Sequence, residues 1–318
     1  MTQPDTTTAS TPPAATAGAV DAAIPSQPAD VIHDIGYRHY DGPRLGRGYA
    51  RRSLYVQSLR GAYGLGRSAK SKVLPMILLA LVCAVAVVMS AVAIYSQAMT
   101  ALPLGYTEFL PQLTLIVFLF VAAQAPQSVS RDLRFRTVPL YFSRPIAPLD
   151  YVGAKYAALT SAMFVFTGVP LVLMYLGALL AKFDFADNTK GLAQGLLSAL
   201  LLSLLYAAVA LLVAALTPRR GFGVAAVIGS LFVPFAATSA VQVIAFDQGH
   251  PDAVNWIGLA SPTSLVGNVQ SAFLGAEGFN PGNSAASGTV GAASLLVCLL
   301  IITGCLALLL RRYRKAGL

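Results

Sequence analysis

Six long apolar stretches without a single Asp, Glu, Lys, Arg or His constrain this chain more than any other feature. They cover approximately residues 73–96, 109–125, 156–181, 192–216, 222–246 and 292–310. A helix of about 20 residues crosses a hydrocarbon core of about 30 Å, and such a segment must satisfy all its backbone polar groups internally. We therefore expect an all-α polytopic membrane protein with six transmembrane helices. Pro111 lies near the start of the short second stretch, Pro170 is expected to kink the third, and Pro234 interrupts the fifth.

Composition supports this class and excludes several functions. Hydrophobic residues make up 56% of the 318 residues and charged residues only 11%, against about 25% in a soluble domain. Proton pumps, ion-coupled carriers and voltage sensors keep ionisable residues inside their spans, because that is where their chemistry takes place. The uncharged stretches argue against all three classes. A carrier that coordinates its ion through backbone carbonyls stays open.

The Lys and Arg residues that flank the stretches predict the orientation in the membrane. Fifteen of them fall on one side, and only Lys182 and Lys190 fall on the other. The positive-inside rule makes the rich side cytoplasmic, so both termini are expected in the cytoplasm and the protein in the plasma (cytoplasmic) membrane. The net charge of +9 is then explained by contact with anionic membrane lipids, and no nucleic-acid partner is expected. The fifteen are Arg60, Arg67, Lys70, Lys72, Arg131, Arg134, Arg136, Arg144, Lys155, Arg219, Arg220, Arg311, Arg312, Arg314 and Lys315.

The residues before the first span divide into two predicted parts. Residues 1–49 are expected to form a cytoplasmic tail, disordered to about residue 30, because that part is rich in Thr, Ala and Pro. Residues 50–72 are expected to form an amphipathic helix in the inner membrane interface, followed by the transmembrane domain 73–318. The apolar face of the predicted amphipathic helix would carry Tyr55, Val56, Leu59 and Tyr63. An irregular basic linker is the alternative.

The segment before the sixth span predicts short helices. Residues 253–274 are moderately apolar, contain the only tryptophan, Trp256, and are broken by Pro262 and Gly267. We expect a re-entrant or interfacial segment here, with Trp256 at the depth of the lipid headgroups. A seventh span is the alternative, and it would place the C-terminal arginines outside.

No catalytic or metal-binding constellation is found in the sequence. There is no phosphate-binding loop, and His33, His39 and His250 are scattered. The three cysteines all lie inside apolar stretches, where they are expected to be small buried hydrophobes. The chain is therefore not expected to be an enzyme or to bind a metal or cofactor itself.

The loop between the second and third spans, residues 127–155, combines charge with an exposed apolar patch. Residues 138–142 form the patch, which Pro139 and Pro145 bracket, while Pro148 and Asp150 predict the start of the next helix. An apolar patch in a charged loop is typical of a surface that a partner protein buries. The alternative is packing against the chain's own basic N-terminal region.

This loop resembles the corresponding loop of ABC-2 type permeases, the membrane subunits of ATP-binding cassette exporters. The resemblance rests on Ser130-Arg131-Asp132, Thr137-Val138-Pro139-Leu140, Ser143-Arg144-Pro145, Leu149-Asp150-Tyr151 and Gly153-Ala154-Lys155, and with the order of spans it extends over residues 50–318. It implies a coupling helix that docks on an ATPase subunit. The implied docking residues are Arg131, Asp132, Arg134, Thr137, Val138, Pro139, Leu140, Tyr141, Phe142, Ser143 and Arg144. Phe135 and Arg136 depart from the pattern, because many members have an acidic residue and Gly there.

The resemblance further implies a permease that binds two copies of a separate ABC ATPase, which would supply ATP and Mg²⁺. The permease would form a homodimer or pair with a homologous permease. Small residues allow close helix approach, so Ala225, Gly229, Ala236 and Ala240 are candidates for the dimer seam. The rival interpretations are a membrane scaffold or regulator without a transport role, and an ion-independent facilitator or channel. The uncharged spans suit an apolar or amphipathic cargo, while a glycan or peptide remains open.

Overall fold

The computed structural model describes residues 42, 45–66, 68–96, 101–135, 141, 146–217, 220–278, 280–282 and 285–316. The predicted N-terminal tail lies almost entirely outside these residues. Leu45–Leu318 forms one unit, and within its described part every regular element is a helix. The helices are α1 (Arg47–Ala62), α2 (Ala69–Tyr95), α3 (Tyr106–Gln112), α4 (Thr114–Arg134), α6 (Pro148–Leu180), α7 (Phe185–Leu216), α8 (Arg220–Asp247), α9 (Pro251–Ile257), η1 (Gly258–Ala260), α10 (Pro262–Phe273) and α11 (Gly288–Ala316).

Five of these helices, α2, α6, α7, α8 and α11, are long and apolar enough to cross a membrane. The predicted second span is a bent pair, because α3 and α4 meet at an angle of 68° beside Leu113. Counting this pair as one span gives six. The polytopic helical class is therefore confirmed, with the second span broken near Pro111 instead of straight. By contrast, α6 and α8 run as continuous helices through Pro170 and Pro234.

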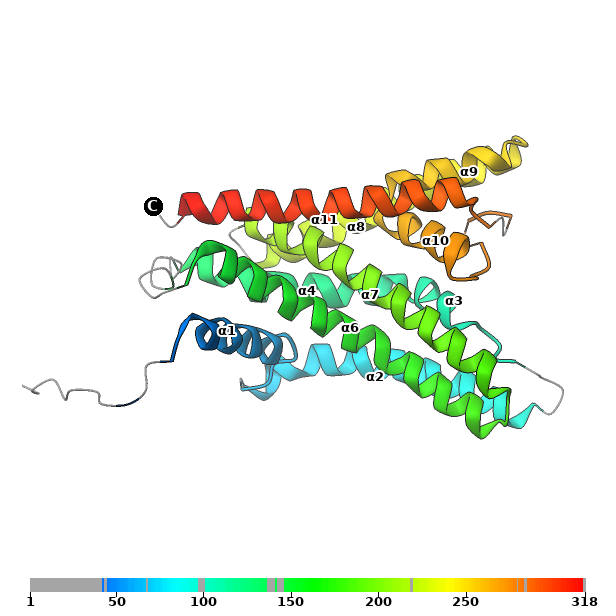
Figure 1. The fold of residues 1–318 in the computed structure, drawn as a ribbon, viewed down its shortest axis with the longest axis horizontal. Coiled ribbons are helices and arrows are strands. Elements are labelled where there is room, and N and C mark those ends of the chain that lie inside the picture. Colours follow the sequence, from blue (N-terminus) through cyan, green and yellow to red (C-terminus); the bar gives the residue numbers. More distant parts are fainter. Residues whose placement is uncertain are drawn as a thin grey trace, which may run out of the picture. The chain divides into compact units, whose positions relative to one another are not determined.

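The long helices pack antiparallel to one another (Figure 1), and this places most charges of the described chain toward its two ends. At one end, which we call the basic end, α2, α6 and α8 begin and α4, α7 and α11 finish. The described basic residues lie mostly at this end, apart from Lys182 and Lys190. The opposite end, which we call the acidic end, contains Glu108, Asp184, Asp187, Asp247, Asp252 and Glu277. The structure thus has the charge asymmetry on which the predicted orientation depends.

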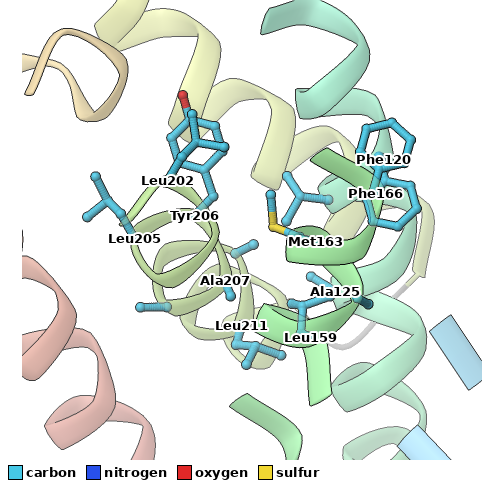
Figure 2. Packing of buried hydrophobic residues seen from close by; sticks show 14 of the residues in the cluster. Phe120, Ala125, Leu159, Met163, Phe166, Leu202, Leu205, Tyr206, Ala207 and Leu211 are labelled. Carbon is cyan, nitrogen blue, oxygen red and sulfur yellow. The ribbon is translucent and has the colours of Figure 1, made fainter. Parts of the chain in front are cut away.

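The core lies between α4, α6 and α7 (Figure 2). Phe120 and Phe166 stack with their ring centroids 4.0 Å apart, and Met163 and Tyr206 are fully buried nearby. Helix α7 contributes a run of small buried residues, Ala207, Ala208, Ala210, Ala214 and Ala215. Small side chains let helix backbones approach closely, which stabilises helix pairs in lipid, where the hydrophobic effect between helices is absent.

Helix α1 packs against α6 and is tied to it by two tyrosines. The hydroxyl of Tyr55 donates to Ser161 Oγ at 2.9 Å, and that of Tyr63 donates to the carbonyl of Ala162 at 2.7 Å. Burial raises the pKa of Tyr63, so this phenol stays protonated and keeps donating. The turn that follows requires Gly64, because its φ is +68° and a Cβ there would lie 2.6 Å from the carbonyl oxygen of Ser71.

The predicted short helices before the last span are present as α9, η1 and α10, each too short to be a span. Five buried polar residues, which we call the amide cluster, fix them to α8 and α11: Gln242, Asn255, Asn268, Asn280 and Ser294. Asn268 Nδ2 donates to the carbonyl of Asn255 at 2.9 Å and to Ser294 Oγ at 3.2 Å. Gln242 Nε2 donates to Asn280 Oδ1 at 3.0 Å, and Asn280 Nδ2 donates to Asn255 Oδ1 at 2.6 Å. These bonds replace the water that the amides lose on burial.

Candidate functional site

Three polar side chains join α4 to α6 at the basic end, and we call them the α4–α6 clasp: Asp132, Tyr151 and Lys155. Lys155 Nζ lies 3.1 Å from Asp132 Oδ2 and donates to the carbonyl of Ser128 at 2.8 Å. The hydroxyl of Tyr151 donates to the same Asp132 oxygen at 2.6 Å. The two helices that carry the predicted coupling loop are thus connected directly below it.

The clasp is shielded from water, which makes its charges interdependent. The side chain of Lys155 is 9% exposed and that of Asp132 is 18% exposed. A charge buried to this degree is tolerated only when it is paired and hydrogen-bonded. The ammonium of Lys155 also lies 5.5 Å from the centre of the Tyr151 ring, within the range of a cation–π contact. Removing either charge would leave the other without its main compensation.

A second ion pair ties the start of α1 to the start of α6. Arg47 Nε lies 2.5 Å from Asp150 Oδ2, and Arg51 is 3.9 Å from the other carboxylate oxygen. The hydrogen bond to Asp150 and the charge of that carboxylate raise the pKa of Arg47. Asp150 also accepts from the backbone N–H of Ala147 at 3.1 Å, which caps α6. The sequence predicts a turn and an N-cap at residues 148–150, but α6 already begins at Pro148, with Ala147 at the N-cap and Asp150 in the first turn.

Three tyrosines extend the clasp toward the loop and toward the last helix. The rings of Tyr141 and Tyr151 have centroids 5.5 Å apart, and those of Tyr151 and Tyr313 are 4.9 Å apart. Tyr313 is fully buried near the end of α11. These contacts join side chains from the loop, α6 and α11 into one aromatic row, which stabilises the packing of the three segments.

The structure describes only part of the predicted docking loop. Asp132 and Tyr141 belong to the described residues: Asp132 is part of the clasp, and the ring of Tyr141 contacts that of Tyr151. Arg131 and Arg134 lie in the last turns of α4, but their side chains fall outside the description, and so do Thr137, Val138, Pro139, Leu140, Phe142, Ser143 and Arg144. Because α4 continues to Arg134 and α6 begins at Pro148, residues 127–134 and 148–155 of the predicted loop are helical.

The other predicted residues are placed clearly. Tyr55 and Leu59 are half-buried and Tyr63 is buried against the core, but Val56 is 38% exposed and lies off that face. The packed face of α1 uses Leu54 and Ala62 instead, because α1 packs against protein along α6. The candidate seam residues of α8 are not packed inside this chain: Ala225 and Ala240 are exposed, and Gly229 and Ala236 half-buried.

Sequence reasoning missed most of the clasp. Lys155 was assigned to a surface loop because it lies just before the apolar stretch 156–181, yet it is buried in the second turn of α6. Its spacing of four residues from Tyr151 and seven from Pro148 was the available signal, since that spacing places Lys155 on the Tyr151 face.

Within the described part of the chain, no group of three or more His, Cys, Asp or Glu residues could hold a metal ion. Comparisons with known proteins give no family for the chain: no protein-family model and no curated protein matches it.

Proposed function

We propose that this protein is the permease subunit of an ABC transporter of the ABC-2 type, which moves a substrate across the membrane with energy from a separate ATPase. The resemblance of the loop sequence motivates this proposal. The observation that supports it best is the α4–α6 clasp, because a buried ion pair joins the two helices at the base of the predicted docking loop. A chain without a phosphate-binding loop of its own would need such a partner for ATP-driven transport.

The clasp suggests how a push on the loop reaches the spans. If an ATPase moves the loop, α4 and α6 shift as one body, since Asp132 cannot leave Lys155 without exposing a buried charge. Helix α6 packs against α1, α2 and α7, so the displacement spreads through most of the helices. Packed helices that have two stable arrangements can pass small local shifts to a distant site, and the proposal requires this of α6 and its neighbours.

The proposed assembly contains two permease copies and two ATPase copies. Helix α8 is the least buried of the five long apolar helices, and large apolar side chains such as Phe232 and Val233 are exposed on it. A Cβ added at Gly229 would meet nothing within 4 Å, so another helix has room to approach there. We place the dimer seam on this helix, along Ala225, Gly229, Ala236 and Ala240.

Co-purification with the ATPase tests the docking step. We expect a phosphate-loop ATPase to be encoded beside the chain in the genome. The full chain is co-expressed with it, and the two are expected to purify together. Replacing Arg131, Arg134 and Arg144 together by Glu should release the ATPase, and so should deletion of residues 138–144. Replacing Lys182 and Lys190 at the acidic end by Glu is the matched control and should leave the complex intact. Survival of the complex in both loop variants would refute the docking site, and ATP hydrolysis by the purified chain alone would refute the division of labour.

The transmission step has a separate readout. Lys155→Met changes the clasp but leaves the loop sequence intact, so the ATPase should still bind. Cargo-stimulated ATP hydrolysis in reconstituted vesicles should fall, because the loop no longer moves α4 and α6 together. Stimulation equal to that of the unchanged protein would show that the clasp does not transmit the motion. If the protein is a scaffold, it should bind the ATPase, but no cargo in a test panel should stimulate ATP hydrolysis.

A further inference from the structure

A pocket of about 380 Å³ lies between α1, α4 and α6 at the basic end. Its polar lining includes Gln57, Ser58, Gln124, Gln127, Asp132 and Lys155. Apolar side chains of α1 and α6, among them Leu54 and Leu159, complete the wall. The pocket falls at the lower end of the volumes, about 300–1,000 Å³, that small-molecule sites have.

Gln124 is the side chain in this pocket that the fold leaves unsatisfied. It is only 1% exposed, and neither its Nε2 nor its Oε1 has a hydrogen-bond partner. The buried Oγ of Ser58, across the pocket on α1, is also without a partner. Leaving buried polar groups unpaired is costly, and native proteins rarely do so without a water or ligand that completes the bonds. The side-chain nitrogens of Gln242, Asn268 and Asn280 at the acidic end, in contrast, are all paired within the chain.

The charges of the lining favour an uncharged ligand. Asp132 and Lys155 are the two charged residues among the described lining residues, and they neutralise each other at 3.1 Å. The unpartnered groups offer an N–H₂ donor and a carbonyl acceptor on Gln124, and a hydroxyl on Ser58 that does both. A group that donates and accepts at neighbouring positions fits this set, and adjacent hydroxyl groups have that property. Leu54 and Leu159 suit the C–H faces that such a polyol carries.

We propose that this pocket binds a small uncharged polyol through adjacent hydroxyl groups, which hydrogen-bond to Gln124 and Ser58. Two sources share this chemistry: a free polyol such as glycerol or inositol, and the polyol headgroup of a lipid that reaches the pocket beside α1. The binding requires no ATPase, so its failure would leave the proposed transport function untouched.

Saturation-transfer NMR on the full chain tests the free polyol. The protein is held in phosphatidylcholine nanodiscs, and glycerol and myo-inositol are the probes. Native mass spectrometry tests the lipid source by comparing retention of phosphatidylinositol and phosphatidylglycerol with that of phosphatidic acid, which carries negative charge but no polyol headgroup. Signal from the free polyol, preferential retention of a polyol-headed lipid, or both would support the site and identify the source. If both signals are absent, the proposal is overturned and the pocket holds only water.

Two variants link the signal to the pocket. Gln124→Met keeps the length of the side chain and removes both polar atoms, so binding should weaken about tenfold or more, as expected when two hydrogen bonds are lost. Gln194→Met, on a half-buried glutamine of α7 outside the pocket, is the matched control and should bind as the unchanged protein does. Gln124→Met should also melt at a higher temperature without ligand, because an unpaired buried amide is gone. Ser58→Leu fills the pocket and provides a second loss of binding. Unchanged binding in both pocket variants would refute this location.

Discussion

Breaking the ion pair between Lys155 and Asp132 should destabilise the protein by about 2–3 kcal/mol. Loss of one partner of a buried pair costs about 3–5 kcal/mol, and the effect falls below this range here because Asp132 is 18% exposed and keeps the hydrogen bond from Tyr151. Lys155→Met also leaves the carbonyl of Ser128 without its donor. Asp132→Asn should cost about 2 kcal/mol, since the ammonium of Lys155 then faces a neutral amide oxygen in place of a carboxylate.

The double variant separates the pair from its surroundings. Lys155→Met with Asp132→Asn should be little less stable than either single variant, which corresponds to a coupling energy of about 2 kcal/mol. The free energy of unfolding is measured by SDS titration in mixed micelles. Arg51→Met with Asp150→Asn is the control cycle at the same end of the bundle, and its coupling should stay below about 0.5 kcal/mol because Arg51 is 62% exposed and 3.9 Å away. Equal coupling in the two cycles would refute the claim that the clasp fixes α4 to α6.

Three further predictions concern packing, the amide cluster and orientation. A Cβ at Gly177 would overlap the side chain of Ser90 on α2, so Gly177→Ala should lower the free energy of unfolding in SDS titration by about 1–3 kcal/mol. Adding Ser90→Gly should restore the lost stability. If it does not, the two helices do not pack this closely. Asn268→Leu removes the donor to Asn255 and Ser294 and should cost about 3 kcal/mol, with faster hydrogen exchange across α9 and α10 than in the rest of the bundle; uniform exchange would contradict a local role of the cluster. In a protein without other cysteines, Asp252→Cys should react with a membrane-impermeant maleimide on intact cells and Arg314→Cys should not, and the opposite pattern would reverse the predicted orientation.

The existence of the helices was predictable from hydropathy, whereas their limits were not. The apolar stretch 156–181 predicts only the part of the helix that crosses the hydrocarbon core. In the structure, α6 begins eight residues earlier, at Pro148. Helical hydrogen bonding continues beyond the hydrocarbon boundary wherever capping and packing allow. Hydropathy therefore does not predict where a helix begins or ends. For this reason Lys155 was predicted at the surface although α4 covers it. The same limit applies to α1, where the pattern of apolar residues placed Val56 on the face that packs against α6, although its side chain lies off that face.

The amide cluster and the pocket could not be derived from the sequence for a different reason. Gln242, Asn268 and Asn280 are uncharged, lie in separate segments and match no motif, so only the folded arrangement of α8, α10 and the following loop brings them together. Gln124 likewise matches no sequence motif, and it lies in the second apolar stretch, whose pattern predicts only a membrane span. What distinguishes it is the absence of a partner in a buried place, which is a property of the fold and not of the residue type.

The clasp and the pocket share Asp132 and Lys155, and this has a thermodynamic consequence. The side chain of Lys155 is only 9% exposed, so water hydrates its ammonium poorly. Asp132 stabilises its charge there, so α4 and α6 keep one relative position while the pair is intact. A ligand in the pocket meets the lining in that same position. If it binds the intact clasp more tightly than the broken one, it must stabilise the clasp by the same free energy, because linkage between two equilibria is reciprocal. Occupancy of the pocket would therefore set how rigidly the base of the loop is held, and with it how much of any push on the loop reaches the spans.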